Sequence, residues 1–261
     1  MKKQVVRKVF GAVCALAAVL SFASCSKKSA NQFVLGLDDS FPPLGFRDES
    51  NKIVGYDIDL AQEVCNRLGK DLVCQPIDWS AKEQELDTGK IDCIWNGFTM
   101  TEERRETMAC TKPYLNNAQV VVVRADSGIK TLADLKGKTV GVQAESSAVE
   151  ALNDNAKVKA SLKKVVEFQE NITAMNDLEI GNIDAVVMDS VVANYSISQT
   201  GKPFVCLDEV LANEEYGIAF AKTNTELRDQ VQKTLEEMEA DGTVAEISNK
   251  WFGTNLSVIG K

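Results

Sequence analysis

Short apolar runs and amphipathic segments alternate along most of the chain. Runs rich in β-branched and aliphatic residues, such as residues 33–37 and 185–188, predict buried strands. In residues 57–68 the apolar positions instead recur at helical spacing, and Gly69 follows as a helix stop. The same criteria predict strands at 72–77, 91–95, 119–123, 139–142, 165–168, 204–207 and 217–220, and helices at 80–87, 101–107, 131–136, from 146, 171–180, 190–198, 225–240 and 243–251.

Strands that alternate with helices predict an α/β protein with parallel sheets covered on both faces. The cycle runs once up to about residue 123 and restarts near residue 131, which predicts two α/β lobes. Ligands bind such open sheets beyond the carboxyl ends of the strands. The segments after residues 37, 77, 95, 142 and 188 are therefore the places where we expect a binding site.

The first 24 residues differ from this pattern. Four basic residues precede an apolar stretch at 9–23, which is shorter than a membrane span and typical of a signal peptide. It ends in Phe22-Ala23-Ser24-Cys25 before a polar run, and this resembles the lipobox of bacterial lipoproteins, although Phe22 stands where an aliphatic residue is usual. We expect cleavage after residue 24, lipid (palmitate) on Cys25 and a tether at 25–32. The alternative is an ordinary secretory signal in which Cys25 is incidental.

Composition excludes several kinds of chemistry. The 261 residues include 29 Lys+Arg, 38 Asp+Glu and no histidine, with a formal net charge of −9. Residues 1–24 hold four of the basic residues and no acidic one, so the remaining 237 residues carry −13. Without histidine there can be no Ser-His-Asp triad, Cys-His dyad or His-ligated zinc. The acidic excess argues against nucleic-acid binding, which needs a basic surface.

Five cysteines follow Cys25, namely Cys65, Cys74, Cys93, Cys110 and Cys206. None has C-x-x-C spacing, so a zinc knuckle or a thioredoxin-like site has no support. Export permits a disulfide, for which Cys65 and Cys74 are nearest in sequence. The alternative, which we favour for most of the five, is burial as small apolar side chains.

Several short motifs occur in a defined order. They are Phe41-Pro42-Pro43, Val54-Gly55-Tyr56-Asp57-Ile58-Asp59-Leu60-Ala61, Gly89-Lys90-Ile91-Asp92, Gly97-x-Thr99-x-Thr101-Glu102-Glu103-Arg104, Leu135-Lys136-Gly137-Lys138-Thr139-Val140-Gly141-Val142, Ile183-Asp184-Ala185-Val186, Tyr216-Gly217-Ile218-Ala219-Phe220, Asp241-Gly242-Thr243 and Trp251-Phe252-Gly253. The ordered set resembles the polar amino-acid-binding family (family 3) of solute-binding proteins, the extracytoplasmic receptors of ABC importers. Each motif alone is weakly specific, but together they cover essentially the whole chain after the leader.

The resemblance implies the fold of type II periplasmic binding proteins. Each of two lobes would contain a mostly parallel sheet flanked by helices, and two crossover strands would join them. One lobe would comprise residues 33–122 and 217–261, and the other residues 123–216. A free L-amino acid would be held between lobes that close by a hinge motion. The resemblance also implies a permease partner, a monomer held to the outer face of the cell membrane by lipid alone, and no cofactor, metal or catalytic residue.

The resemblance assigns the two charged ends of the amino acid to opposite lobes. Arg104 would bind the ligand carboxylate with two parallel hydrogen bonds, which lysine could not reproduce. Thr99 would add a hydroxyl donor, and Ser147 a helix N-terminus that favours an anion. The ligand ammonium would bind Asp189 and a carbonyl of Asn96 or Gly97.

The ligand side chain would lie between Phe41 and Trp79, with Asp38, Gln143 and Glu145 near its far end. Trp79 as a core residue is an open alternative, and Glu145 is expected to face solvent. Mid-strand Trp95 is expected in the core. Alone, Arg104 would be read as a surface ion-pair residue and Asp189 as the N-cap of the next helix. Their motif positions favour ligand contact instead.

We therefore expect a receptor for a polar L-amino acid. Asp38, Asp39 and Glu145, with Trp79 as a cation–π partner, favour arginine or lysine, and glutamine and cystine are alternatives. The rival class is an enzyme on the same fold that resembles cyclohexadienyl dehydratases, with Glu145 as its general acid. We do not expect a sensor lobe of a kinase or channel, because no transmembrane or signalling segment follows Phe252-Gly253.

Overall fold

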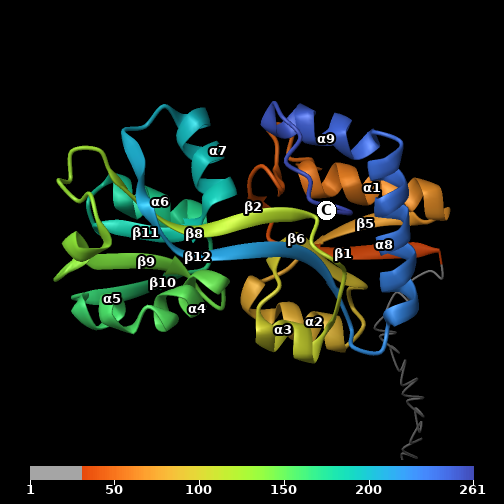
Figure 1. The fold of residues 1–261 in the computed structure, drawn as a ribbon, viewed down its shortest axis with the longest axis horizontal. Coiled ribbons are helices and arrows are strands. Elements are labelled where there is room, and N and C mark those ends of the chain that lie inside the picture. Colours follow the sequence, from red (N-terminus) through yellow and green to blue (C-terminus); the bar gives the residue numbers. More distant parts are fainter. Residues whose placement is uncertain (1–30) are drawn as a thin grey trace, which may run out of the picture. The chain divides into compact units, whose positions relative to one another are not determined.

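A computed structural model describes residues 31–261, which form one compact unit. The expected signal peptide at 1–24, the lipid site Cys25 and residues 25–30 of the tether lie outside the described residues. Figure 1 shows two groups of helices and strands, and two long strands, β8 (Leu115–Arg124) and β12 (Phe204–Phe220), run between them. We call the right-hand group the first lobe and the left-hand group the second lobe.

The first lobe contains both ends of the described chain. Its helices lie on both faces of its strands. In Figure 1, α1 and α9 lie above the strands and α2 and α3 below, while α8 runs past the level of the strands at the right. Its elements are β1 (Gln32–Leu37), β2 (Ser40–Phe41), β3 (Gly45–Arg47), β4 (Ile53–Val54), α1 (Tyr56–Leu68), β5 (Asp71–Pro76), the 3-10 helix η1 (Trp79–Ala81), α2 (Lys82–Asp87), β6 (Cys93–Thr99), α3 (Glu102–Thr107), β7 (Ala109–Cys110), α8 (Thr225–Ala240) and α9 (Thr243–Phe252).

The second lobe is built from one uninterrupted segment between β8 and β12. Its strands β9 and β11 are buried except for Thr139, and they are apolar apart from polar residues at their ends, as expected for parallel strands covered on both faces. Its elements are η2 (Leu132–Leu135), β9 (Thr139–Gln143), α4 (Ser147–Asp154), α5 (Ala156–Ser161), β10 (Lys164–Phe168), α6 (Asn171–Glu179), β11 (Ala185–Asp189) and α7 (Ser190–Thr200).

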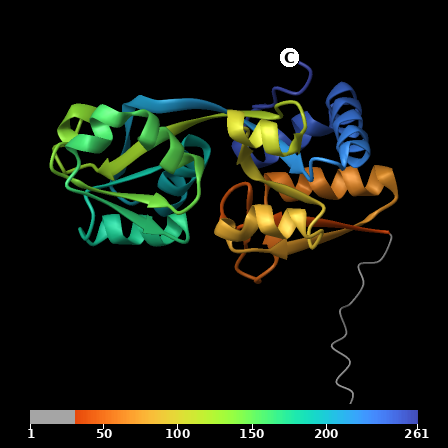
Figure 2. The same cartoon turned by 90° about the horizontal axis from the view of Figure 1, so that it is seen from below.

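One sheet runs through both lobes in the order β10-β9-β11-β8-β12-β6-β1-β5, with β7 paired to β12. Within each lobe the pairs are parallel, namely β1 with β5 and β6, and β9 with β10 and β11. Every antiparallel pair in this sheet involves β8 or β12. The predicted α/β class and the two crossover strands are confirmed, and Figure 2 shows the same two strands connecting the lobes from a second direction.

Local sequence explains where helix α1 begins and ends. Asp57 and Asp59 occupy its first turn and Arg67 its last, which matches the helix dipole. Gly69 ends the helix in the left-handed conformation with φ 65°. The apolar positions of the helix face inward, so the predicted helix at 57–68 is confirmed to within one residue.

Two predicted strands are in fact one. The sequence predicts separate strands at 204–207 and 217–220, whereas β12 runs unbroken for 17 residues with register shifts on the way. Its middle is mostly polar because it crosses between the lobes, where alternate side chains face solvent, so no apolar run marks it. For the same reason β8 begins four residues before the prediction. The strands β2, β3, β4 and β7 were not predicted because they are only two or three residues long.

The lobe boundaries expected at 122/123 and 216/217 fall inside β8 and β12, which are continuous strands. The boundaries therefore stay a prediction, since nothing interrupts the chain at either position.

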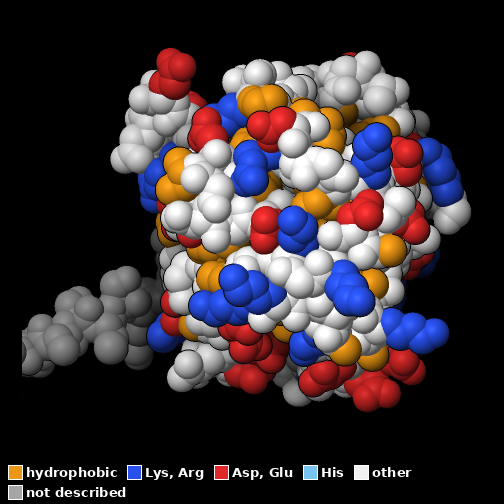
Figure 3. All heavy atoms as spheres, turned by 90° about the vertical axis from the view of Figure 1, so that its left-hand side faces the viewer, with side chains coloured by type: hydrophobic (Ala, Val, Ile, Leu, Met, Phe, Trp, Pro, Cys, Tyr) orange, Lys and Arg blue, Asp and Glu red, His pale blue; other side chains and the backbone are white. Residues whose placement is uncertain are grey.

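Cys65, Cys74, Cys110 and Cys206 are free thiols, and Cys65 and Cys93 are buried. The Cys65–Cys74 disulfide that export would permit is thus not formed. Figure 3 shows the outer end of the second lobe, where side chains of both charges are interspersed with scattered apolar ones. Within residues 31–261, no helix has both the length and the apolar character that a membrane crossing requires.

Candidate functional site

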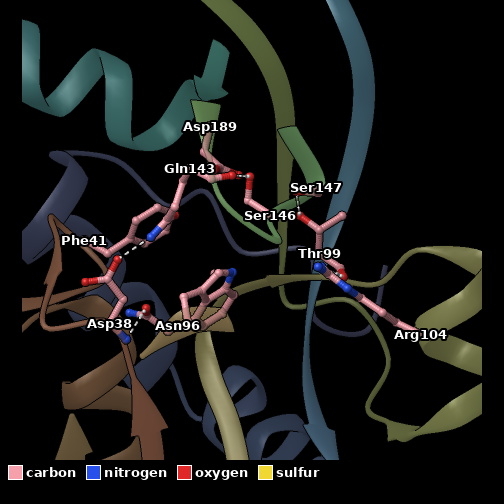
Figure 4. A pocket seen from close by; sticks show the side chains of 11 residues that line it. Asp38, Phe41, Asn96, Thr99, Arg104, Gln143, Ser146, Ser147 and Asp189 are labelled. Atoms are coloured by element: carbon pink, nitrogen blue, oxygen red, sulfur yellow. Dashed lines mark hydrogen bonds between the residues drawn. The ribbon is translucent and has the colours of Figure 1, made fainter. Parts of the chain in front are cut away.

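A pocket between the lobes is lined by all ten residues that the sequence predicts for ligand binding (Figure 4). Ser146 also lines it. The ten are Asp38, Phe41, Trp79, Asn96, Gly97, Thr99, Arg104, Gln143, Ser147 and Asp189. The fold thus brings them together from five strand ends, while their contacts with a ligand stay predictions.

Asp38 lies where β1 ends and is held in place by neutral donors. Its Oδ1 accepts hydrogen bonds from the backbone N–H and the hydroxyl of Ser40, at 2.9 and 2.7 Å. Its Oδ2 accepts one from Nε2 of Gln143, at 2.7 Å across the gap between the lobes. The carboxylate is 7% exposed, and no basic side chain within residues 31–261 forms an ion pair with it. Asp38 therefore presents a buried negative charge to the pocket.

Gly97 turns the chain at the floor of the pocket. Its φ is 56°, a left-handed conformation, and a Cβ there would lie 2.5 Å from Cδ1 of Leu44 and 3.0 Å from the Phe41 ring. Its N–H donates to Oδ2 of Asp57 at 2.8 Å. Burial raises the pKa of Asp57 to about 7, although the bonds from Gly97 and Tyr114 favour the charged form. Position 97 thus has room only for glycine, and Asp57 sets the direction of its peptide.

Arg104 is in α3, whose N-cap Thr101 accepts a hydrogen bond from the Arg104 N–H. The guanidinium is only 5% exposed and stacks 4.7 Å from the centre of the Phe98 ring. Its Nη1 donates to the Thr99 carbonyl at 3.0 Å, and its Nη2 lies 3.6 Å from Oε1 of Glu150 in the second lobe. The guanidinium is therefore fixed at the pocket wall rather than exposed as a surface residue.

Asp189 lies on the opposite wall, at the end of β11. It is the N-cap residue of α7, but its side chain makes no capping bond. Its Oδ1 instead accepts from Asn117, Gln119 and the hydroxyl of Tyr216, at 2.6, 3.0 and 2.7 Å. Burial, followed by the charge of Glu214, raises the pKa of Asp189 to about 7. Asp189 is thus the N-cap residue by position, but its side chain does not cap the helix and belongs to a buried polar cluster.

The aromatic residues near the site lie in the core, in the pocket wall or in both. Trp79 lines the pocket, is 8% exposed and contacts the Phe98 ring edge-on at 6.2 Å, so it belongs to the core and to the wall at once. Phe41 is 5% exposed and also lines the pocket. Trp95 is fully buried, as expected for a mid-strand core residue.

Hydrogen bonds cross between the lobes around the pocket. Lys82 of the first lobe donates to the Glu145 carbonyl of the second at 2.9 Å, and burial lowers the pKa of Lys82 to about 8. Ser147 donates to the Thr99 hydroxyl at 3.2 Å. The side chain of Glu145 is exposed and does not line the pocket, which matches the solvent-facing expectation and removes the general acid of the enzyme alternative from the site.

Four residues of the pocket surroundings were not predicted, namely Asn117 and Gln119 of β8, and Glu214 and Tyr216 of β12. Each pair is spaced two apart, so both members face the same side of their strand. Two polar residues spaced two apart in a strand are the sequence feature that could have indicated these positions. Within residues 31–261, no group of three or more Cys, Asp or Glu side chains could hold a metal ion.

A family model for bacterial extracellular solute-binding proteins, family 3, matches residues 33–254. The L-cystine-binding protein TcyJ of Escherichia coli strain K12 is 30% identical over 232 residues, which span 88% of this chain and 86% of that protein. The crystal structure of Tv2483 bound to L-arginine has a TM-score of 0.85 and 36% identity, and covers 88% of this chain and 94% of that one. A Streptococcus pneumoniae ABC uptake transporter substrate-binding protein with bound histidine has the same score and identity, with 87% and 95% covered.

Proposed function

Because the chain belongs to family 3 of the bacterial extracellular solute-binding proteins, we propose that it captures a free L-amino acid outside the cytoplasm and delivers it to an ABC importer permease. Similar proteins are named for cystine binding or were solved with arginine or histidine bound. In this proposal the protein binds and releases its ligand without changing it chemically and needs no cofactor.

The observation that carries the proposal is the placement of opposite charges on opposite walls. Arg104 of the first lobe and Asp189 of the second both line the same pocket. A free amino acid carries one carboxylate and one ammonium, so it would pair with both residues at once. Ser147, the first residue of α4, adds the N-terminus of a helix to the side that would hold the carboxylate.

Such a ligand would hold the lobes together. Its carboxylate would contact Arg104 of the first lobe and its ammonium Asp189 of the second, so it would bind the closed arrangement better than an open one. This difference in affinity is what a ligand-driven closure requires. The hydrogen bonds from Lys82 to the Glu145 carbonyl and from Gln143 to Asp38 cross the same gap, so they would further stabilise the closed state.

The charge of the pocket favours a basic ligand side chain. The charged residues in its wall are Asp38, Arg104 and Asp189. The two ends of the amino acid neutralise Arg104 and Asp189, which leaves Asp38 unpaired. A guanidinium or ammonium on the ligand side chain would pair with Asp38, and the Trp79 ring could stack on it. We therefore propose arginine or lysine, with glutamine and cystine as alternatives.

We also propose that the protein is a monomer attached to the outer face of the cell membrane through lipid on Cys25. The support is the signal-peptide pattern followed by the lipobox-like Phe22-Ala23-Ser24-Cys25. Expression of the full chain and of Cys25→Ser, followed by separation of membrane and soluble fractions, tests this. Labelling by a palmitate analogue that persists in Cys25→Ser would exclude the site.

Isothermal titration calorimetry of residues 31–261 against the twenty amino acids and cystine tests the ligand. The fragment forms one compact unit, so we expect it to bind as the full chain does. Tight one-to-one binding of arginine or lysine supports the proposal. Binding of histidine, glutamine or cystine alone would retain the receptor function and reject the basic side chain. The absence of binding to any amino acid would reject the function.

A further inference from the structure

A second carboxylate lies beside Asp189 in the cleft. Glu214 is on the crossover strand β12, and its Oε2 accepts hydrogen bonds from Asn117, Gln119 and Thr99 at 2.9, 2.9 and 2.8 Å. The Ser147 hydroxyl approaches the same oxygen at 3.5 Å. Glu214 thus belongs to the polar cluster at the pocket, although the motifs of the sequence do not include it.

The two carboxylates are held together by shared donors. Nδ2 of Asn117 lies 2.6 Å from Oδ1 of Asp189 and 2.9 Å from Oε2 of Glu214, so these two oxygens are at most 5.5 Å apart. Nε2 of Gln119 also donates to both, at 3.0 and 2.9 Å. Two neutral amides from one strand therefore keep two acidic groups together.

The charged and titratable groups around this pair leave its charge uncompensated. On β12, Tyr216 donates its hydroxyl to Asp189, and Glu215 is turned away in an exposed pair with Arg105. The residues contributed by β6, β8 and α4, which are Thr99, Asn117, Gln119 and Ser147, are neutral. Arg104 is bound to the Thr99 carbonyl and paired with Glu150. No basic side chain of the described chain forms an ion pair with Asp189 or Glu214.

Two like charges that are this close and partly desolvated cannot both remain ionised without a cation between them. The raised pKa of Asp189, about 7, agrees with that geometry. A proton or a ligand ammonium can each supply one positive charge. Exchange of one for the other leaves the charge of the cluster unchanged, so the two compete for the same place.

We propose that Glu214 is the second carboxylate of the ammonium site, and that Asp189 and Glu214 share one proton, which passes to solvent when a ligand ammonium binds. Glu214 also accepts a hydrogen bond from the Thr99 hydroxyl, so this proton points at Glu214 and not at the place expected for the ligand carboxylate. This inference rests on the proposed function, because it assumes that an amino acid is the ligand.

Proton release on binding is measured by titrating L-arginine into the protein in two buffers of different ionisation enthalpy at the same pH and ionic strength. The buffers are phosphate and imidazole at pH 6 and 7, and borate and Tris at pH 9. L-cystine is titrated in parallel. The apparent binding heat depends on the buffer in proportion to the protons released. We expect close to one proton released per ligand at pH 6, about half at pH 7 and none at pH 9. For one linked proton, the affinity should fall up to about tenfold per pH unit below pH 7. A buffer-independent heat at pH 6 and 7 would overturn the proposal.

Glu214→Gln tests the residue itself. The matched control is Glu215→Gln, which changes the next residue of the same strand. Glu214→Gln keeps the shape but removes the like charge, so we expect it to bind with no proton release at pH 7 and with a lower affinity at pH 9. Glu215→Gln should retain the proton release and pH profile of the unmodified protein. Equal proton release in all three proteins would exclude Glu214.

Carboxyl ¹³C NMR of the ligand-free protein separates this inference from the proposed function and does not depend on the variant folding. We expect a side-chain carboxyl signal that titrates near pH 7, is distinct from the signal of Asp57, and is lost in Asp189→Asn. If no amino acid binds but this signal is present, the proposed function fails while the shared proton stands. If arginine binds and every carboxyl assigned to the pair titrates below pH 5, the shared proton fails while the function stands.

Discussion

Replacement of Arg104 by alanine removes the contact that every amino-acid ligand would share. The guanidinium is 5% exposed, and one of its nitrogens is already bound to the Thr99 carbonyl. A ligand carboxylate paired with it would therefore be largely desolvated. Breaking such a buried charge pair by removing one partner costs about 3–5 kcal/mol. Since about 1.4 kcal/mol corresponds to a factor of ten, we expect roughly two to four decades of lost affinity.

The assay is calorimetric titration of the best ligand into the unmodified protein, Arg104→Ala, Arg104→Lys and Arg105→Ala. Arg104→Lys keeps a positive charge without the planar fork, so it should recover only part of the affinity. Arg105→Ala is the matched control, because this neighbour is exposed and pairs with Glu215 outside the pocket. It should change the affinity by less than about fivefold, since exposed ion pairs contribute at most ~1 kcal/mol.

Thermal unfolding without ligand must accompany these titrations, because Arg104 also touches the Thr99 carbonyl and the second lobe. A variant that unfolds near the temperature of the unmodified protein and still loses binding supports the carboxylate contact. Folded Arg104→Ala that binds within tenfold of the unmodified protein would refute the reasoning, since the ligand carboxylate would then lie elsewhere.

Three further predictions follow from buried charges. Asp38→Asn should weaken arginine and lysine binding about tenfold to a hundredfold, as expected for a charge-assisted hydrogen bond of ~1.5–3 kcal/mol. Glutamine binding should stay nearly unchanged. An equal loss of affinity for all ligands in calorimetry would contradict the contact between Asp38 and the ligand side chain. Lys82→Met keeps the apolar part of the side chain but removes the hydrogen bond to the Glu145 carbonyl, which links the two lobes. Because the closed state loses this bond, ligand affinity should fall about tenfold. Unchanged affinity would show that the bond does not stabilise the closed state. Burial raises the pKa of Asp57 in the folded protein to about 7, so its stabilising contribution is lost as the pH rises from about 4 to 7, by up to about 1.4 kcal/mol per pH unit. Urea unfolding at pH 5 and 8 should show a smaller loss of unfolding free energy in Asp57→Asn than in the unmodified protein. An equal loss in both proteins would contradict the assignment.

The periodic segments were predictable because local patterns determine them. Helix α1 has acidic residues at its start, a regular apolar face and Gly69 at its end, and all three signals agree. The strands β9 and β11 are apolar along their centres because both of their faces are covered. The polar parts of the crossover strands, at the start of β8 and in the middle of β12, carried no such signal, since polar residues facing the cleft look the same in sequence as residues facing water. This is why the middle of β12 was predicted as a connection between two strands.

The sequence by itself determined the α/β class, and its resemblance to a known family indicated ten residues that line one pocket, because ordered motifs can be recognised without the tertiary structure. Only the tertiary structure decided which groups surround those residues. Asn117 and Glu214 are 97 positions apart, and they meet because β8 and β12 pair antiparallel between the lobes. Whether a polar side chain in a strand is solvated or becomes one of two desolvated carboxylates depends on that pairing, and no local pattern encodes it.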